Sequence, residues 1–286
     1  MNSRAAVFIR EMKPEDVDFA VGLIHAAGWA GESREAFEAF LAHDPAGCFI
    51  AEANGETAGV CIAVSYARNG FIGELIVRDD LRILGLGRSL FQKALDRLEA
   101  AGFANIFLDG DLNAVPYYEI MGFRKICRSL RFRGMIEGRR HPRIRRMEPA
   151  DMDRVCTLDR ELFGDDRSFF LRRRLKQNPR LALVSERDGR LTGWIMARPG
   201  DGLLAVGPLA ALDPEDAGPL LEHLAVENAG EVLRLGVLES NAAAIELLRN
   251  RPGLKEGVYS WRMVRGPDVR MGDHPALFAI GSAAKG

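Results

Sequence analysis

VRDDLRILGLGRSLFQKAL, residues Val77 to Leu95, joins a run typical of a β-strand to a run typical of a helix. Gly85 and Gly87 stand at the junction, although each costs about 0.5–1 kcal/mol relative to alanine. A strand, a turn with glycines and a helix N-terminus direct unpaired backbone N–H groups at one point, where the helix dipole adds roughly half a positive charge. With Arg82 and Arg88 beside the turn, the stretch predicts a cradle for a phosphate or pyrophosphate.

The composition describes a globular chain that is long enough for two modest cores. Of its 286 residues, 47% are hydrophobic and 28% are charged, and the formal net charge is -1. This balance gives no electrostatic reason to expect a nucleic acid or a membrane as partner, and no apolar run approaches the ~20 residues of a membrane helix. Four scattered cysteines without a CxxC pair predict buried free thiols, a cytoplasmic location and no metal site.

The chain repeats itself. IREMKPEDVD, from Ile9, returns as IRRMEPADMD, from Ile144, an offset of 144 − 9 = 135. FIAEANGETAGV, from Phe49, returns as LVSERDGRLTGW, from Leu183. Because both copies keep their segments in the same order, a tandem duplication is more economical than chance.

We therefore predict one domain at residues 1–136, a second at 142–266, and a C-terminal tail at 267–286 that runs back over one domain. In each copy a short strand precedes two helices, a hairpin, a long strand, a helix, a further strand, a short helix and a closing strand. Asn54-Gly55 and Asp188-Gly189 favour tight hairpins. The predicted fold class is α+β, with a mixed, mostly antiparallel sheet flanked by helices in each domain.

The spacing around the glycines excludes two common phosphate-binding loops. No GxxxxGK[ST] string occurs, and Leu90 stands where GxGxxG requires its third glycine. The string present, R-x-x-G-x-G between a strand and a helix, resembles the coenzyme A pyrophosphate loop of the GNAT N-acetyltransferase superfamily. A second signature follows, because DLNAVPYYEIMGFRK (111–125) resembles the segment in which a polar residue opens a short helix with a tyrosine, followed by Gly-Phe. Asp111 opens it here, where the family often has Asn, and Asn113 follows.

This resemblance, which spans most of residues 6–134, implies acetyl transfer from acetyl-CoA to an amine, without a metal. It implies that the Tyr118 hydroxyl protonates the leaving thiolate, which is typically worth ~10²–10⁴ in rate. Strand amides would pair with the pantetheine arm and polarise the thioester carbonyl, and loop amides would hold the pyrophosphate. The expected cofactor-binding residues are Leu75, Ile76, Val77, Arg82, Ile83, Leu84, Gly85, Leu86, Gly87, Arg88, Asp111 and Asn113.

The sequence does not identify the general base. Glu74 is the candidate, because it lies on the strand before the glycine loop, near where family members often carry a carboxylate. A solvated glutamate at a strand edge is the alternative interpretation. Asp109 and Asp111 are the other carboxylates near the expected cleft, and Tyr117 is assigned to packing.

The second copy has lost both signatures. Gly85 becomes Glu215 and Gly87 becomes Ala217, so the loop LDPEDAG places three carboxylates where a pyrophosphate would lie. Leu248 stands in the place of Tyr118. We therefore expect a degenerate copy that is kept for packing, for a homodimer contact, or for shaping the acceptor side of the first copy's cleft.

Two basic stretches are not expected to bind nucleic acid. Such binding would require both stretches on one face, together with aromatic side chains on which bases can stack. Residues 124–146 contain a strand whose charges alternate with core residues, and residues 171–180 form the solvated side of a helix. Either could orient an acidic acceptor or the 3′-phosphate of coenzyme A.

The predicted function is transfer of an acetyl or other acyl group from acetyl-CoA to a primary amine of a small molecule by direct attack. A protein acetyltransferase acting on lysines or N-termini is one alternative. A non-catalytic regulatory protein that binds acyl-CoA is the other.

Overall fold

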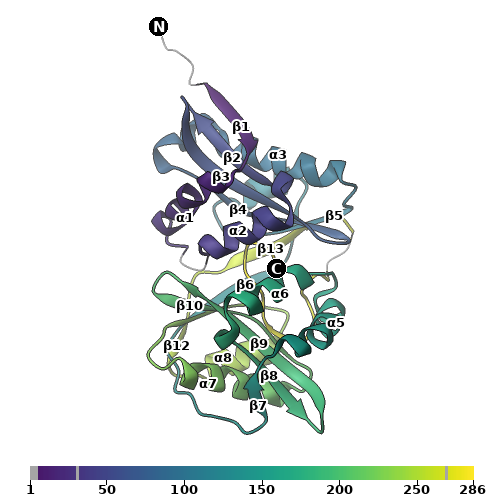
Figure 1. The fold of residues 1–286 in the computed structure, drawn as a ribbon. Helices are drawn as coiled ribbons and strands as arrows, with labels where there is room; N and C mark the ends of the chain where they lie inside the picture. The colour runs from purple at the N-terminus through teal and green to yellow at the C-terminus, as the bar shows by residue number, and fades with distance from the viewer. Residues whose placement is uncertain (1–5, 30–31, 268–269) are drawn as a thin grey trace.

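The computed structural model describes residues 6–29, 32–267 and 270–286, so parts of the predicted first domain (1–5, 30–31) and tail (268–269) lie outside the described residues. Two α/β halves are stacked end to end (Figure 1). The N-terminal half contains β1 (Val7–Glu11), α1 (Val17–Ala26), α2 (Arg34–His43), β2 (Cys48–Ala53), β3 (Glu56–Ser65), β4 (Asn69–Val77), α3 (Leu86–Ala100), β5 (Asn105–Gly110), α4 (Val115–Ile120) and β6 (Arg124–Gly134). The C-terminal half contains β7 (Ile144–Arg146), α5 (Met152–Phe163), α6 (Ser168–Gln177), β8 (Ala182–Arg187), β9 (Arg190–Gly200), β10 (Leu203–Ala211), α7 (Ala217–Glu227), β11 (Leu233–Leu238), α8 (Ala242–Arg249), β12 (Leu254–Glu256), β13 (Ser260–Arg265) and β14 (Leu277–Ala279).

The strands of both halves form one continuous sheet. Its order is β1-β2-β3-β4-β5-β13-β6-β11-β10-β9-β8-β7, with β12 paired to β6 and β14 paired to β10. Most pairs are antiparallel, but β4 pairs with β5 and β10 with β11 in parallel. This mixed, mostly antiparallel arrangement flanked by helices confirms the predicted fold class.

Local sequence signals determine the hairpins and the long helix of the first half. Asn54 and Gly55 adopt φ values of 53° and 83°, as a two-residue loop with two left-handed positions requires. Asp188 and Gly189 do the same at 52° and 72°. In α3 the residues at helical spacing are buried against the sheet, namely Leu86, Leu90, Phe91, Ala94, Leu95 and Leu98.

The two halves exchange their closing strands. β13, from the end of the C-terminal copy, pairs with β5, and Met263 on β13 packs in the core under α3. Reciprocally, β6 pairs with β11, and Leu130 and Phe132 on β6 pack in the core under α7. Each half therefore contains a strand of the other copy, which makes the two halves interdependent.

The described part of the tail lies between the halves, and Figure 1 places the C-terminal end beside α6. Its strand β14 pairs with β10, and Ala284 lies directly on Gly73 of β4. A Cβ at Gly73 would lie 2.4 Å from the carbonyl oxygen of Ala284, so only glycine allows this contact. Lys285 is buried, with its Nζ 4.5 Å from the ring centre of Phe40. The tail thus packs against both halves.

The prediction that residues 171–180 form a solvated helix face is wrong for one arginine. Arg174 of α6 is buried, and its guanidinium donates to the carbonyl oxygen of Gly207. Nearby, Arg167 is buried and donates twice to Asp159 at 2.8 Å. Because α6 packs between the halves, these cations face protein rather than water.

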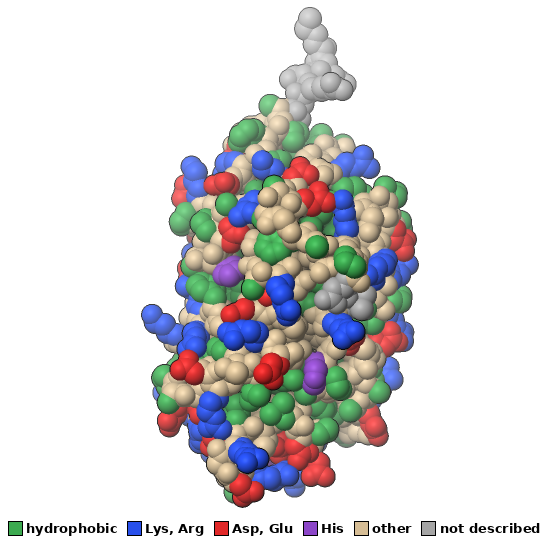
Figure 2. Space-filling view, turned by 90° about the vertical axis from the view of Figure 1, so that its right-hand side faces the viewer, with side chains coloured by type: hydrophobic (Ala, Val, Ile, Leu, Met, Phe, Trp, Pro, Cys, Tyr) green, Lys and Arg blue, Asp and Glu red, His purple; other side chains and the backbone are tan. Residues whose placement is uncertain are grey.

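The surface shown in Figure 2 carries basic and acidic side chains interspersed, in agreement with the small net charge. Within residues 6–29, 32–267 and 270–286, no helix combines the length and the apolar character that crossing a bilayer requires.

Candidate active site

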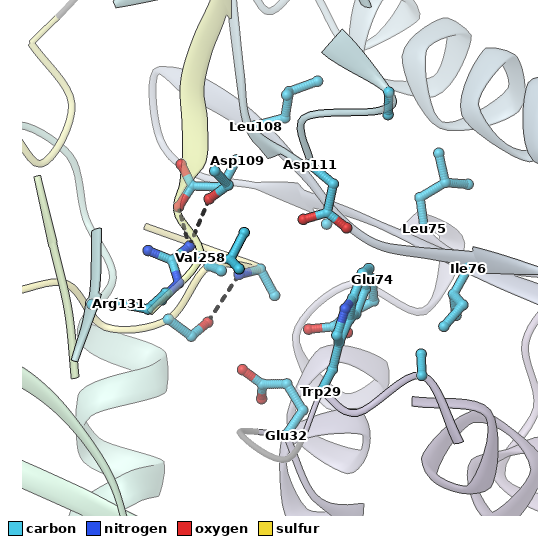
Figure 3. A pocket seen from close by; sticks show the side chains of 18 of the residues that line it. Trp29, Glu32, Glu74, Leu75, Ile76, Leu108, Asp109, Asp111, Arg131 and Val258 are labelled. Carbon is cyan, nitrogen blue, oxygen red and sulfur yellow. Dashed lines mark hydrogen bonds and ion pairs between the residues drawn. The ribbon is translucent and has the colours of Figure 1, made fainter. Parts of the chain in front are cut away.

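A cavity of about 1020 Å³ lies between the two halves. The N-terminal half lines it with β4, the end of β5 and the segment that leads into α4, and the C-terminal half lines it with β10, β11 and the tail. The side chains of Glu32, Glu74 and Asp111 point into this space (Figure 3). The cavity therefore joins both halves around a group of carboxylates.

β4 and β5 separate to form a wedge at one wall of the cavity. Their parallel pairing ends at Ile72 and Leu108, whereas β4 continues to Val77. The next amide after β4, on Arg78, donates to Ala58 of β3. Since successive residues of a strand alternate, the amides of Val77 and Leu75 point the other way, into the wedge. The wedge thus offers unpaired main-chain donors to a ligand, in the place predicted for the pantetheine arm.

A β-bulge in β4 directs Glu74 into the cavity. Val60 and Ile62 of β3 pair with Ile76 and Gly73, so Cys61 faces two residues of β4. Glu74 takes the left-handed conformation there, with φ 50°. A non-glycine residue in this conformation is strained, and such strain is typically found at functional positions.

The environment of Glu74 disfavours its negative charge. The side chain is 6% exposed, and its Oε2 has no hydrogen-bond partner among the described residues. Burial, and then the nearby charge of Glu32, raise the pKa of Glu74 to about 8. A solvated strand-edge glutamate, the alternative interpretation, does not fit this burial.

Glu32 has the opposite character, although it lies nearby. Burial alone would raise its pKa, but the charges of Arg198 and Lys285 hold the pKa below the usual value. Arg198 donates to Oε1, and the Nζ of Lys285 lies 3.7 Å from Oε2. The two carboxyl groups therefore differ in protonation at neutral pH, because Glu32 is ionised and Glu74 is largely protonated.

Tyr118 lies at the cavity on α4 and is 8% exposed. Its ring packs 5.1 Å from the ring of Phe91, and a Cβ at Gly110 would lie 2.9 Å from it. Burial raises the pKa of the Tyr118 hydroxyl above its ordinary value, so the group keeps its proton. Tyr117 packs on Phe91 and the Arg88 guanidinium instead.

The glycine loop has the geometry of an anion cradle. Gly85 precedes α3 with φ 75°, and nothing lies within 4 Å of the position where its Cβ would be. The first amides of α3 have no partner within the helix. Arg82 is largely exposed and pairs with Asp79 at 2.6 Å. The loop thus presents bare main chain at the outer end of the wedge.

The structure brings together only some of the predicted cofactor residues. Those that line the cavity are Leu75, Ile76, Val77, Arg82, Gly87, Asp111 and Asn113. Leu86 is fully buried in the core under α3, and Ile83 is 92% exposed. The other predicted residues can contact an anion only through their main chain or an exposed side chain. They are Ile83, Leu84, Gly85, Leu86 and Arg88.

Asp109 lines the cavity, near the cleft as expected, but its carboxylate is already paired with cations. Arg262 and Arg131 both donate to it, and Ser129 adds a hydroxyl at 2.9 Å. Although burial opposes it, these cations keep the pKa of Asp109 below its usual value. Asp109 therefore fixes the two arginines and is not a candidate base. Asp111 faces the cavity, and partial desolvation raises its pKa.

The contribution of the C-terminal half to the cavity has no signature in the sequence. Arg198 on β9, Arg234 on β11 and the tail segment 280–284 line the cavity. Arg131 is the exception, because it lies in a basic stretch that was expected to orient an acidic acceptor. The others come from positions that have no motif of their own.

The wedge of the C-terminal half is filled by the chain itself. β10 and β11 pair in parallel only at 204–206 and 233–235 and then separate, as β4 and β5 do. β14 occupies the gap, because Leu277 and Ala279 pair with β10 and the Ile280 amide donates to Gly236 of β11 at 2.9 Å. β10 also has a bulge, displaced by one residue, and counted from the flanking strand pairs Pro208 stands where β4 has Glu74. The tail thus takes the place that a ligand would take in the first wedge.

The acidic loop of the C-terminal copy is arranged differently from the expectation. Asp216 is buried, accepts from the Thr192 hydroxyl at 2.5 Å and lies near Arg143 and Arg187, so it does not face the loop exterior. Asp213 accepts from the Glu215 amide at 3.1 Å. Only two of the three carboxylates therefore remain near the position of a pyrophosphate. Leu248 is fully buried in the core.

Comparison with known proteins identifies both copies. Residues 15–123 match the model of the acetyltransferase (GNAT) family, and residues 155–279 match an acetyltransferase (GNAT) domain. No curated protein sequence matches the chain.

Solved structures show the same fold over nearly the whole chain. An acetyltransferase candidate from Pyrococcus horikoshii has a TM-score of 0.83 at 23% identity, over 98% of this chain and 96% of that one. A GCN5-related N-acetyltransferase from Sphaerobacter thermophilus has a TM-score of 0.62 at 18% identity, over 93% and 98%. A tandem GNAT protein from the clavulanic acid biosynthesis pathway has a TM-score of 0.61 at 14% identity, over 92% and 100%.

Proposed function

Since the chain belongs to the GNAT acetyltransferase superfamily as a tandem GNAT protein, we propose that it transfers an acetyl group from acetyl-CoA to the primary amine of a small molecule. The open wedge between β4 and β5 carries this proposal, because it leads from the bare amides of the glycine loop to Glu74 and Tyr118 in one cavity. Acetyl-CoA supplies the activated acetyl thioester. The first turn of α3 would hold its pyrophosphate, and the amides of Leu75 and Val77 its pantetheine arm.

Glu74 and Tyr118 divide the proton transfers between them. An alkyl ammonium with a pKa near 10 must lose a proton before it can attack. A carboxyl group with a pKa of about 8 is a stronger base than an ordinary carboxylate, so Glu74 is suited to accept that proton. As the N–C bond forms and the C–S bond breaks, the nitrogen loses its second proton to solvent, while Tyr118 donates its proton to the leaving sulfur and regains one from solvent. The products are the N-acetylated amine, the free thiol and one released proton.

The walls of the cavity favour a small acceptor over a protein chain. The C-terminal half and its tail line the cavity together with the N-terminal half, and we infer that they cover the side where a peptide would enter. We infer that this cover is the function of the degenerate copy.

The proposal is tested with the full chain by measuring thiol release from acetyl-CoA with a panel of amines, together with calorimetry of acetyl-CoA binding. We expect one acetyl-CoA per chain and thiol release that depends on an amine. A protein that binds one acyl-CoA but releases no thiol, and that binds equally well as Tyr118→Phe, would be a regulatory sensor. Absence of acetyl-CoA binding would refute the proposal.

A further inference from the structure

Arg234 is a cation of the cavity that the proposed chemistry does not use. It lies on β11, is half-buried and lines the cavity from the C-terminal half. Among the described residues, no carboxylate pairs with it, whereas Arg131 is bound by Asp109 and Arg198 by Glu32. Burial of a charge without a partner costs folding free energy.

Like charges surround Arg234 and increase this cost. Arg133 lies directly opposite it in the antiparallel register of β6 and β11, and Arg131 is two residues further along β6. Opposed like charges destabilise a sheet. Burial, and then the charge of Arg131, lower the pKa of Arg234, and the charge of Glu32 only partly opposes them. An anionic group of a ligand would offset this repulsion.

The N-terminal half lines the same cavity with carboxyl groups that can accept hydrogen bonds from an amine. Asp111 and Glu74 lie on the N-terminal half, where the acetyl group would arrive. The charge of Arg234 acts on Glu74, since it lowers the pKa of that carboxyl group. A ligand that bridges these walls therefore meets carboxyl groups at one end and a guanidinium at the other. This polarity matches a small zwitterion, with its amine toward the acetyl group.

We propose that the acceptor is a small amino carboxylate, such as an amino acid, whose carboxylate binds Arg234 of the C-terminal half while its amine lies against Glu74. This inference rests on the proposed acetyltransferase function. A guanidinium binds a carboxylate with two parallel hydrogen bonds, and an uncharged side chain in its place cannot form this pair. One unpaired cation matches the single charge of a carboxylate better than the double charge of a phosphate.

The test compares amino acids with the same amines without the carboxylate, namely phenylalanine with phenethylamine, leucine with isopentylamine and lysine with cadaverine. O-phosphoethanolamine represents the phosphate. For the unmodified chain we expect kcat/KM at least ten-fold higher for the best amino acid than for its decarboxylated amine. Equal or better turnover of the decarboxylated amines would overturn the inference and leave the acetyltransferase intact, and so would a preference for O-phosphoethanolamine.

Variants of the two opposed arginines assign the effect. Arg234→Gln should lower kcat/KM for the amino acid about 10–100-fold, mainly through KM, and change that of the decarboxylated amine less than about three-fold. Arg234→Lys should restore part of the loss. Arg133→Gln removes the same charge from an exposed side chain outside the cavity lining and should leave the preference unchanged. An equal loss in Arg133→Gln, or an equal loss on both kinds of amine, would contradict the assignment.

Binding of products decides the inference even without turnover. N-acetylphenylalanine should bind the full chain more tightly than N-acetylphenethylamine in calorimetry, and Arg234→Gln should abolish the difference. Equal affinities for the two compounds would overturn it. Failure of acetyl-CoA to bind at all would instead count against the proposed function.

Discussion

The two wedges of the sheet start from the same backbone and end differently. In both copies a parallel pair separates just before a bulge, at 72 and 108 in the first and at 206 and 235 in the second. Edges left by such a separation expose main-chain donors and acceptors that need partners. In the second copy β14 supplies them, whereas in the first copy they face the cavity. The second copy is thus stabilised by its own chain at the position where the first copy opens into the cavity.

Tyr118→Phe is the strongest way to break this comparison. If only the N-terminal wedge performs the chemistry, loss of this one hydroxyl should lower kcat about 10²–10⁴-fold, because the thiolate then leaves without a proton donor. The dissociation constant for acetyl-CoA should change less than about two-fold. Tyr117→Phe, on the neighbouring packing residue, is the control and should keep nearly full activity. A similar loss in both variants would indicate damaged packing around Phe91.

Glu74→Gln examines the residue that Pro208 replaces in the second copy. We expect kcat/KM at pH 8 to fall about 10²-fold, because the proton acceptor is lost. In the unmodified chain activity should rise with pH through about 8, as the carboxyl group ionises, and the variant should lack this limb. A pH profile that survives the substitution would assign the base to another group.

The same variant has a signature in stability. A pKa raised from 4.5 to about 8 on folding stabilises the fold only while Glu74 is protonated, so that contribution is lost as the pH rises through about 8. The melting temperature of the unmodified chain should therefore fall more between pH 7 and pH 9 than that of Glu74→Gln. Parallel curves would refute the buried, uncharged state of Glu74.

Gly85→Asp makes the loop of the first copy resemble the acidic loop of the second. A like charge beside a pyrophosphate costs ~1–4 kcal/mol, so the dissociation constant for acetyl-CoA in calorimetry should rise about five- to several hundred-fold. Gly85→Ala introduces the same left-handed strain without the charge and should have a much smaller effect. If both weaken binding equally, backbone strain rather than charge controls the loop.

Asn241→Asp tests whether the tail alone closes the second wedge, because Asn241 holds the tail segment that contains β14. The Asn241 amide donates to the carbonyl oxygens of Pro275 and Leu277, and its oxygen accepts from the Ala244 amide at the start of α8. The aspartate keeps the acceptor and loses both donors, so the free energy of unfolding should fall by about 1–3 kcal/mol. Acetyl-CoA should still bind once per chain, since Leu248 and the acidic loop remain. A second bound equivalent would show that the tail alone closes the second wedge.

Much of this protein could be predicted from short-range signals. Asn54-Gly55 and Asp188-Gly189 fixed two hairpins, because both dipeptides accept left-handed conformations. The periodic apolar residues of α3 fixed its buried face. Glu74 and Tyr118 were named from a strand and a short helix, and the structure places both at one cavity. Whether they act there is a prediction.

The sequence by itself determined the duplication, the fold class and the loss of the glycine loop in the second copy, since each of these is written in neighbouring residues. Only the tertiary structure decided that β6 and β13 change places, that β14 fills one wedge, and that Arg234 and Glu74 line the same cavity. These contacts join residues dozens to more than a hundred positions apart. Strand pairing between distant segments depends on the packing of the whole chain, and no local pattern of residues encodes it.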